Sequence, residues 1–125
     1  MDLVDVALRF FGTRYDWGGN KPDEGFDCSG FVLEVMRSVG LHDNRDFTSQ
    51  QLYSLLSREY VSTEPQRNAI LFFGKNPVNI THVAIAIDSK LMLEAGGEGR
   101  VPTNSGYVRI RPISNRKDFI GGFAL

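Results

Sequence analysis

One cysteine stands in a segment whose residue types favour nucleophilic chemistry. Cys28 lies in the run YDWGGNKPDEGFDCSGF, and the pattern predicts a helix that begins near Asp27. Unpaired N–H groups and the positive end of a helix stabilise a thiolate at such a position. Ser29 and Gly30 keep the first turn small, so a substrate backbone can approach the sulfur. Because the Asp27 carboxylate opposes a thiolate, the cysteine also needs a basic partner.

A histidine and a glutamate have the types and spacing to complete such a site. His82 opens the predicted strand HVAIAI, where it shares one face with Ala84 and Ala86 because side chains alternate along a strand. The small alanines leave room on that face for a helix to pack. Glu94 follows at an even separation, across a predicted turn near Asp88, so its carboxylate falls on or near the same face. It can then orient the imidazole and stabilise the imidazolium, which predicts nucleophilic catalysis by Cys, His and Glu.

The elements that must position these residues are helices first and strands second. The apolar periodicity predicts helices over 2–11 and from Asp27 to Gly40, and a capping box at Thr48 opens a third helical stretch. Short strands bounded by turn residues are predicted over 69–73, 81–87, 91–95, 107–113 and 119–123. Helices followed by an antiparallel meander predict one α+β domain over 1–125.

Length, charge and cysteine content exclude several classes of function. The chain has 125 residues and a formal net charge of −1, so neither nucleic acid nor a membrane is expected as its partner. One cysteine and two histidines form no disulfide and fit no zinc pattern, so we expect no metal and no cofactor. The acidic N-terminus differs from a secretion signal, and no run of about 18 apolar residues occurs. We therefore expect a soluble product made in the cytoplasm.

The combined motifs resemble one known family. The string Y-x-W-G-G…P…G-F-D-C-S-G-F, followed by I-L-F-F, T-H-V-A-I-A-I and L-E-A, resembles the NlpC family of papain-like cell-wall cysteine peptidases over about residues 3–97. The resemblance implies N-terminal helices packed on a C-terminal antiparallel sheet, with the nucleophile at a helix N-terminus. It also implies cleavage of peptidoglycan (murein) stem peptides, typically between D-glutamate, through its γ-carboxyl, and a diamino acid.

The resemblance also implies a role for each matching residue. Cys28 matches the nucleophile, His82 the base, and Glu94 the residue that orients the base. The reaction would be acyl transfer through a thioester.

Four further positions match substrate-binding residues of the family. Tyr15 matches a tyrosine that helps to stabilise the oxyanion, alongside backbone N–H groups at Cys28. Asp27 and Ser29 match positions that hold the free amine of an N-terminal L-alanine, and Trp17 matches an aromatic wall of the groove.

Three features depart from the pattern of the family. The third catalytic position, Glu94 here, is usually His, Asn or Gln. The stretch before the first strand usually reads Gly-Asp, whereas this chain has Asn68 and Ala69. The loop between Tyr15 and Cys28 is one residue longer than the commonest spacing.

The biological setting stays open between several alternatives. A bare domain of this size indicates a phage tail component, an effector delivered by a secretion machine, or a cytoplasmic murein-recycling enzyme, and we favour the first two. Such a protein would act at the cell wall and would have phage tail or secretion-machine proteins as partners. The alternatives in function are a weakly active or inactive structural module of a phage tail tip, and a related thiol amidase or acyltransferase.

Overall fold

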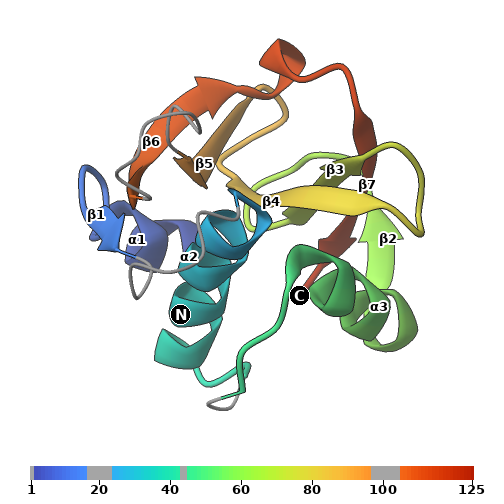
Figure 1. Ribbon diagram of the computed structural model, residues 1–125, viewed down its shortest axis with the longest axis horizontal. Coiled ribbons are helices and arrows are strands. Elements are labelled where there is room, and N and C mark those ends of the chain that lie inside the picture. The colour runs from blue at the N-terminus through green and yellow to red at the C-terminus, as the bar shows by residue number, and fades with distance from the viewer. Residues whose placement is uncertain (1, 17–23, 43–44, 97–104) are drawn as a thin grey trace.

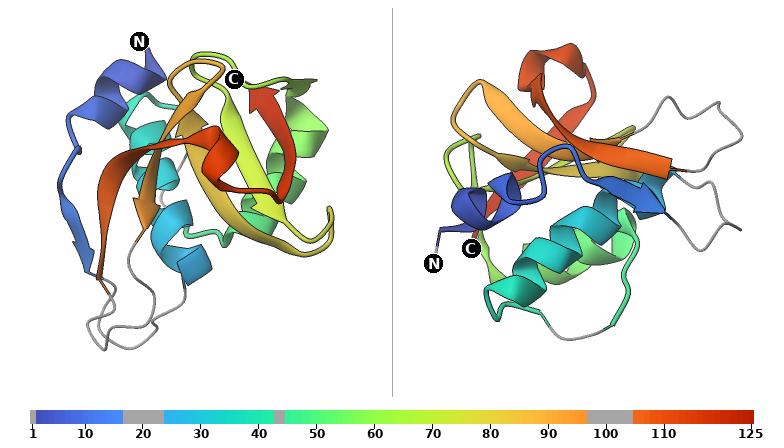
Figure 2. Two further views of the ribbon diagram at one scale, coloured as in Figure 1. Left: turned by 90° about the horizontal axis from the view of Figure 1, so that it is seen from above. Right: turned by 90° about the vertical axis from the view of Figure 1, so that its left-hand side faces the viewer.

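Seven antiparallel strands form one sheet, and α2 and α3 lie together on one side of it (Figures 1 and 2). The computed structural model describes residues 2–16, 24–42, 45–96 and 105–125. The helices are α1 (Leu3–Leu8), α2 (Glu24–Ser38), α3 (Ser49–Glu59) and the short 3-10 helix η1 (Ile113–Asn115). The strands are β1 (Arg14–Asp16), β2 (Val61–Thr63), β3 (Ile70–Gly74), β4 (Ile80–Ala86), β5 (Leu91–Gly96), β6 (Ser105–Pro112) and β7 (Phe119–Ala124). This architecture confirms the expected α+β class.

The central strands follow one another as a meander. The order across the sheet is β1-β6-β5-β4-β3-β7-β2, so β3 to β6 are neighbours in sequence and in space. The strand β7 returns to pair with β3, and the short strands β1 and β2 close the two edges. Because each of the two edge strands has only three residues, its pairing depends on the longer strand beside it. The sequence patterns accordingly missed both.

Local signals fix the ends of the helices. The side chain of Asp2 accepts hydrogen bonds from the N–H groups of Val4 and Asp5 and so caps α1. The predicted capping box is present at the start of α3, where Thr48 and Gln51 bond reciprocally. Gly40 takes a φ of 79° just after α2, as expected for a glycine that stops a helix.

The helix that carries Cys28 begins earlier than expected. The sequence predicted a start near Asp27 with the cysteine at the helix N-terminus, but α2 begins at Glu24, so Cys28 is its fifth residue. Glu24 and Asp27 both fall in the first turn, where acidic residues complement the positive end of the helix. In a helix that begins there, the N–H of Cys28 donates to the C=O of Glu24.

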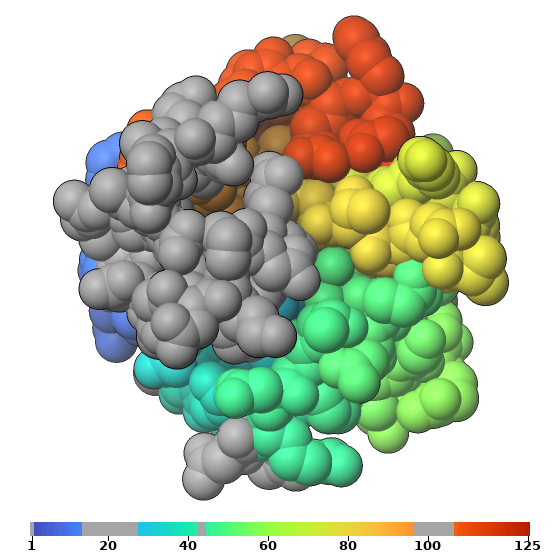
Figure 3. Space-filling view, in the orientation of Figure 1, coloured from blue at the N-terminus to red at the C-terminus, as the bar shows by residue number. Residues whose placement is uncertain are grey.

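Residue Gln50 joins α3 to the hairpin of β3 and β4. Its Oε1 accepts a hydrogen bond from the N–H of Ile80 at 2.7 Å, and its Nε2 donates to the C=O of Pro77 at 3.0 Å. The segments of α3 (green) and of this hairpin (yellow) adjoin on the face seen in Figure 3. These bonds hold the helical layer against the strand that carries His82.

The expectation that a helix packs on the alanine face of β4 is wrong. The helices pack on the opposite face, where Val83 and Ile85 join the main core with residues of α1, α2 and α3. Ala84 and Ala86 belong to a second cluster that includes Ile113 of η1. The larger side chains face the helices because they bury more apolar surface there than alanine does. None of the helices in the described ranges has the length and apolar character needed to cross a bilayer.

Asn68, which stands where the family pattern has glycine, adopts a left-handed conformation with a φ of 74°. Its Oδ1 accepts a hydrogen bond from the N–H of Val4 at 2.9 Å, and its own N–H donates to the C=O of Ala86 at 3.0 Å. Asparagine tolerates this conformation better than other residues with a Cβ, and its side chain ties the start of the sheet to α1.

We therefore expect Asn68→Ala to lower the free energy of unfolding by about 2 kcal/mol, since it loses the side-chain bond and adds left-handed strain. Asn68→Gly loses the same bond but avoids the strain, so it should cost less despite the greater freedom of glycine in the unfolded chain. Urea unfolding of the three proteins measures both values. An alanine variant as stable as the glycine variant would contradict this account.

Candidate active site

A buried histidine and a buried glutamate form the centre of the site. His82 on β4 and Glu94 on β5 contact each other through Nε2 and Oε1 at 2.6 Å. Their exposed fractions are 2% and 3%, so water screens the contact little. The ring of His82 also lies against Phe73 of β3, with 5.6 Å between the ring centroids. The two strands thus bring together two of the residues that the sequence proposed for catalysis.

Cys28 reaches the same histidine from the helical layer. The helix α2 packs across β4 and β5, and Cys28 is fully buried in the main core. Its side chain lies near enough to His82 to raise the pKa of the imidazole. Glu94 occupies Nε2 of the ring, and Nδ1 has no hydrogen-bond partner in the described part of the chain. Nδ1 is therefore the ring nitrogen that remains for the thiol, and hydrogen bonds between catalytic groups are often long or poorly aligned in free enzymes.

The charges of the site reinforce one another. Burial lowers the pKa of His82, but the attraction and hydrogen bonding of Cys28 and then of Glu94 outweigh it and raise this pKa to about 9. Burial raises the pKa of Glu94, but the hydrogen bonds and charges of His82 and Arg109 outweigh it and lower this pKa to about 2. At neutral pH the site therefore holds an imidazolium beside a carboxylate.

Arg109 is a member of this cluster that the sequence analysis missed. It lies directly opposite Glu94 in the pairing of β5 with β6, and its Nε donates to Oε2 of Glu94 at 3.0 Å. Opposite charges across two strands could have signalled the pair, but only with the register of the strands known. Residues 97–104 join the two strands, and a connection of that length leaves the register open in the sequence.

The proposed substrate-binding residues are described in part. Ser29 is buried beside Cys28 in α2. The backbone of Tyr15 pairs with Gly106 at the sheet edge, and Asp27 lies in the first turn of α2, but the side chains of both are outside the described residues. Trp17 lies outside the described residues altogether. Their proposed roles therefore stay predictions.

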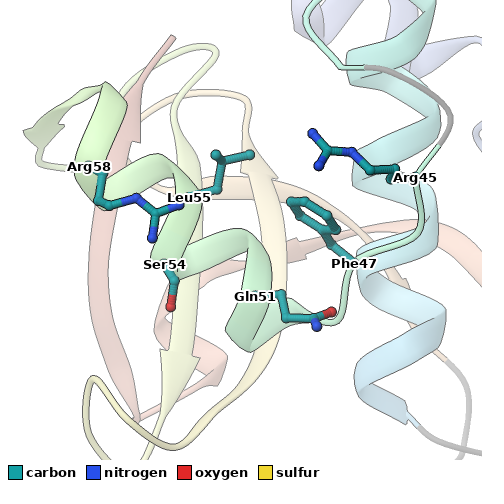
Figure 4. Close-up of a pocket in the computed structure, with 6 residues that line it drawn as sticks. All are labelled: Arg45, Phe47, Gln51, Ser54, Leu55 and Arg58. Atoms are coloured by element: carbon teal, nitrogen blue, oxygen red, sulfur yellow. The ribbon is translucent and has the colours of Figure 1, made fainter.

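A hollow lies apart from these residues, between α3 and the segment that precedes it (Figure 4). It has a volume of about 290 Å³ and is lined by Arg45, Phe47, Gln51, Ser54, Leu55 and Arg58. The guanidinium of Arg45 lies 5.4 Å from the centre of the Phe47 ring, a cation–π contact. None of the proposed catalytic residues lines this hollow. The ranges that the structure describes also hold no group of three His, Cys, Asp or Glu side chains able to bind a metal ion.

Two of the curated relatives of the chain are bacterial peptidases by name. The bifunctional muramidase/DL-endopeptidase CwlT of Bacillus subtilis is 31% identical over 116 residues, which cover 90% of this chain and 34% of that protein. The gamma-D-glutamyl-L-lysine dipeptidyl-peptidase of Bacillus cereus is 31% identical over 117 residues, which cover 86% of this chain and 33% of that protein. The chain thus spans about a third of the length of each of these two relatives.

A solved structure and a family model agree with these relatives. The crystal structure of the NlpC/p60 domain of the peptidoglycan hydrolase SagA superposes with a TM-score of 0.70 and 26% identity, over 99% of this chain and 97% of that one. The likeness confirms the papain-like form of the fold that the sequence motifs implied. The model of the NlpC/P60 family matches residues 12–115, a range that contains Cys28, His82 and Glu94. The chain therefore belongs to the NlpC/P60 family.

Proposed function

We propose that this chain is a cysteine peptidase that cleaves the stem peptides of peptidoglycan. The observation that carries the proposal is the buried series of contacts from Cys28 to His82 to Glu94. A thiol next to an imidazole that a carboxylate orients is the arrangement that nucleophilic catalysis requires. The names of the relatives, a DL-endopeptidase and a gamma-D-glutamyl-L-lysine dipeptidyl-peptidase, support peptidoglycan as the substrate.

The proposed reaction passes through a thioester. The Cys28 thiolate attacks the carbonyl carbon of the scissile amide, and His82 then gives its proton from Nδ1 to the leaving amine. The same histidine removes a proton from the water that hydrolyses the thioester. Tyr15 is the proposed side-chain donor to the oxyanion. The N–H of Cys28, which already donates within α2, can contribute only as a shared donor.

We further propose that the bond cleaved joins the γ-carboxyl of D-glutamate to a diamino acid. The name of the Bacillus cereus relative supports this choice, since it specifies a γ-D-glutamyl bond. Asp27 and Ser29 would hold the free amine of an N-terminal L-alanine, and Trp17 would form a wall of the groove. Action at the cell wall after delivery by a phage tail or a secretion machine also stays a prediction.

Replacement of the nucleophile tests the proposal directly. Because Cys28 is the only thiol in the chain, Cys28→Ser and Cys28→Ala should abolish the cleavage of purified peptidoglycan and of released stem peptides. Mass spectrometry of the digest should show new γ-D-glutamyl carboxyl ends and new diamino-acid amines with the wild type only. Cleavage by the alanine variant at the wild-type rate would refute the peptidase assignment. New ends at a different bond would refute the proposed bond but not the cysteine chemistry.

The two histidines provide a matched pair of variants. His82→Asn should abolish cleavage, because the variant can neither hold the thiolate nor protonate the leaving group. His42→Asn should keep wild-type activity, since His42 follows the C-terminal end of α2, whereas Cys28 lies near its N-terminal end. Similar losses in both variants would show that histidine substitution acts through stability rather than through chemistry. Thermal unfolding of each variant supplies that control.

The charge of Glu94 predicts a change in the pH profile. Activity needs the imidazolium, so kcat/KM should fall on the alkaline side as His82, whose pKa is raised to about 9, loses its proton. Glu94→Gln keeps an oxygen that can accept the hydrogen bond but removes the negative charge, which lowers the pKa of His82. The variant should stay active, with its alkaline limb about one pH unit lower. If the alkaline limb does not move, a group other than Glu94 orients His82.

A further inference from the structure

Both oxygens of the buried carboxylate are occupied by cationic groups. Oε1 of Glu94 contacts Nε2 of His82 at 2.6 Å, and Oε2 accepts the hydrogen bond from Nε of Arg109 at 3.0 Å. Only 4% of the Glu94 side chain is exposed, against 23% of the Arg109 side chain. The arginine therefore approaches the site from its solvent side and fixes the plane of the carboxylate. A carboxylate held at both oxygens cannot rotate without breaking a bond.

The backbone beside Arg109 is shaped to receive its guanidinium. A Cβ atom on Gly96 would lie 2.7 Å from Nη2 and 3.2 Å from Cζ of Arg109, so any other residue there would displace the guanidinium. Gly96 pairs with Tyr107 across the two strands, and the Tyr107 ring lies 6.0 Å from Cζ. Glu94 and Gly96 on β5 and Tyr107 on β6 thus surround the guanidinium of Arg109. An exposed ion pair between two flexible side chains has no such surroundings.

We propose that Arg109 is a positioning residue, which acts on the Cys28–His82 pair by holding Glu94 ionised and aligned with the imidazole. This proposal rests on the proposed function in one respect, that Cys28 and His82 are the catalytic pair. Arg109 contacts neither Cys28 nor His82 in any bond that the described residues make. Its influence must therefore pass through Glu94.

The direct field of Arg109 has little net effect on the ion pair. A cation near the pair favours the thiolate and disfavours the imidazolium, so its two contributions oppose each other. Asp118, which bonds to Arg116, is a further charged group that interacts with His82, and it is independent of Arg109. Arg109 can therefore affect the pair only through the ionisation and the orientation of the Glu94 carboxylate. Without the arginine, Oε2 would be a buried acceptor without its cation, and the carboxylate could turn away or take up a proton.

A double-mutant cycle tests whether Arg109 acts through Glu94. The four proteins are the wild type, Arg109→Gln, Glu94→Gln and the double variant. Two rates are measured at pH 6: alkylation of Cys28, the sole thiol, by iodoacetamide, and cleavage of the tripeptide L-Ala-γ-D-Glu-diaminopimelate. Alkylation reports the thiolate–imidazolium pair without any substrate. Arg111→Gln removes the same charge from the same strand, opposite Met92 rather than Glu94, and is the matched control.

We expect Arg109→Gln to lower the alkylation rate and kcat by up to about tenfold, and by no more than Glu94→Gln does, with KM changed by less than about twofold. In the Glu94→Gln background, Arg109→Gln should lower neither rate further, because the negative charge that Arg109 holds in the wild type is already absent. Arg109→Lys keeps the cation but not the planar Nε donor, so it should recover part of the rate. Arg111→Gln should match the wild type in both rates.

Other results would overturn the proposal. An equal loss from Arg109→Gln in both backgrounds, or a change in KM alone, would mean that Arg109 acts on the substrate or on the fold rather than through Glu94. Unchanged rates in Arg109→Gln and Arg109→Lys would mean that Arg109 has no part in the site. If the wild type alkylates as expected and the cycle is non-additive, but no peptidoglycan fragment is cleaved, the proposed function fails and the role of Arg109 stands.

Discussion

The contact between Glu94 and His82 is the interaction on which the rest of the site depends. A carboxylate and an imidazole that are 3% and 2% exposed have lost most of their hydration, so each depends on its protein partners for stability. Glu94 carries a negative charge between two cationic groups, His82 and Arg109. The loss of either cation leaves the buried carboxylate without one of its partners.

The antiparallel sheet supplies the register that this series needs. Glu94 lies opposite Arg109 on β6, and His82 lies opposite Phe73 on β3. A slip of one residue between these strands would turn every charged side chain to the other face. Apolar clusters on both faces of the sheet oppose such a slip, and the bonds of Gln50 tie α3 to the same hairpin. Ordinary packing therefore holds the charged groups in place.

Much of this arrangement could be predicted from the sequence, because local rules determine it. The even separation of His82 and Glu94 placed them within reach of each other, and the caps at Asp2, Gly40 and Thr48 are properties of short segments. Features that depend on distant parts of the chain were missed. They are the two short edge strands and the pairing of Glu94 with Arg109.

Two of the errors have the same cause. Alanines on β4 indicated where a helix had room to pack, but the helix follows the larger apolar surface around Val83 and Ile85. An aspartate before Cys28 indicated where α2 begins, but Glu24 offered an earlier start with two acidic residues in its first turn. In each case a signal taken from a few neighbouring residues indicated the wrong place. The side chains of Tyr15 and Asp27, and Trp17 as a whole, lie outside the described residues, so their places in the site depend on the motif alone.

The glutamate at the third catalytic position is best understood together with its neighbours. A neutral acceptor such as Asn or Gln can orient an imidazole without a counter-ion, whereas Glu94 brings a full negative charge into a buried site. Arg109 supplies the opposite charge, and Gly96 supplies the space that its guanidinium occupies. A side chain at position 96 would displace the cation and so expose Glu94 to protonation. Glu94, Arg109 and Gly96 are therefore in direct contact or close approach, and the ion pair depends on the space that the glycine leaves.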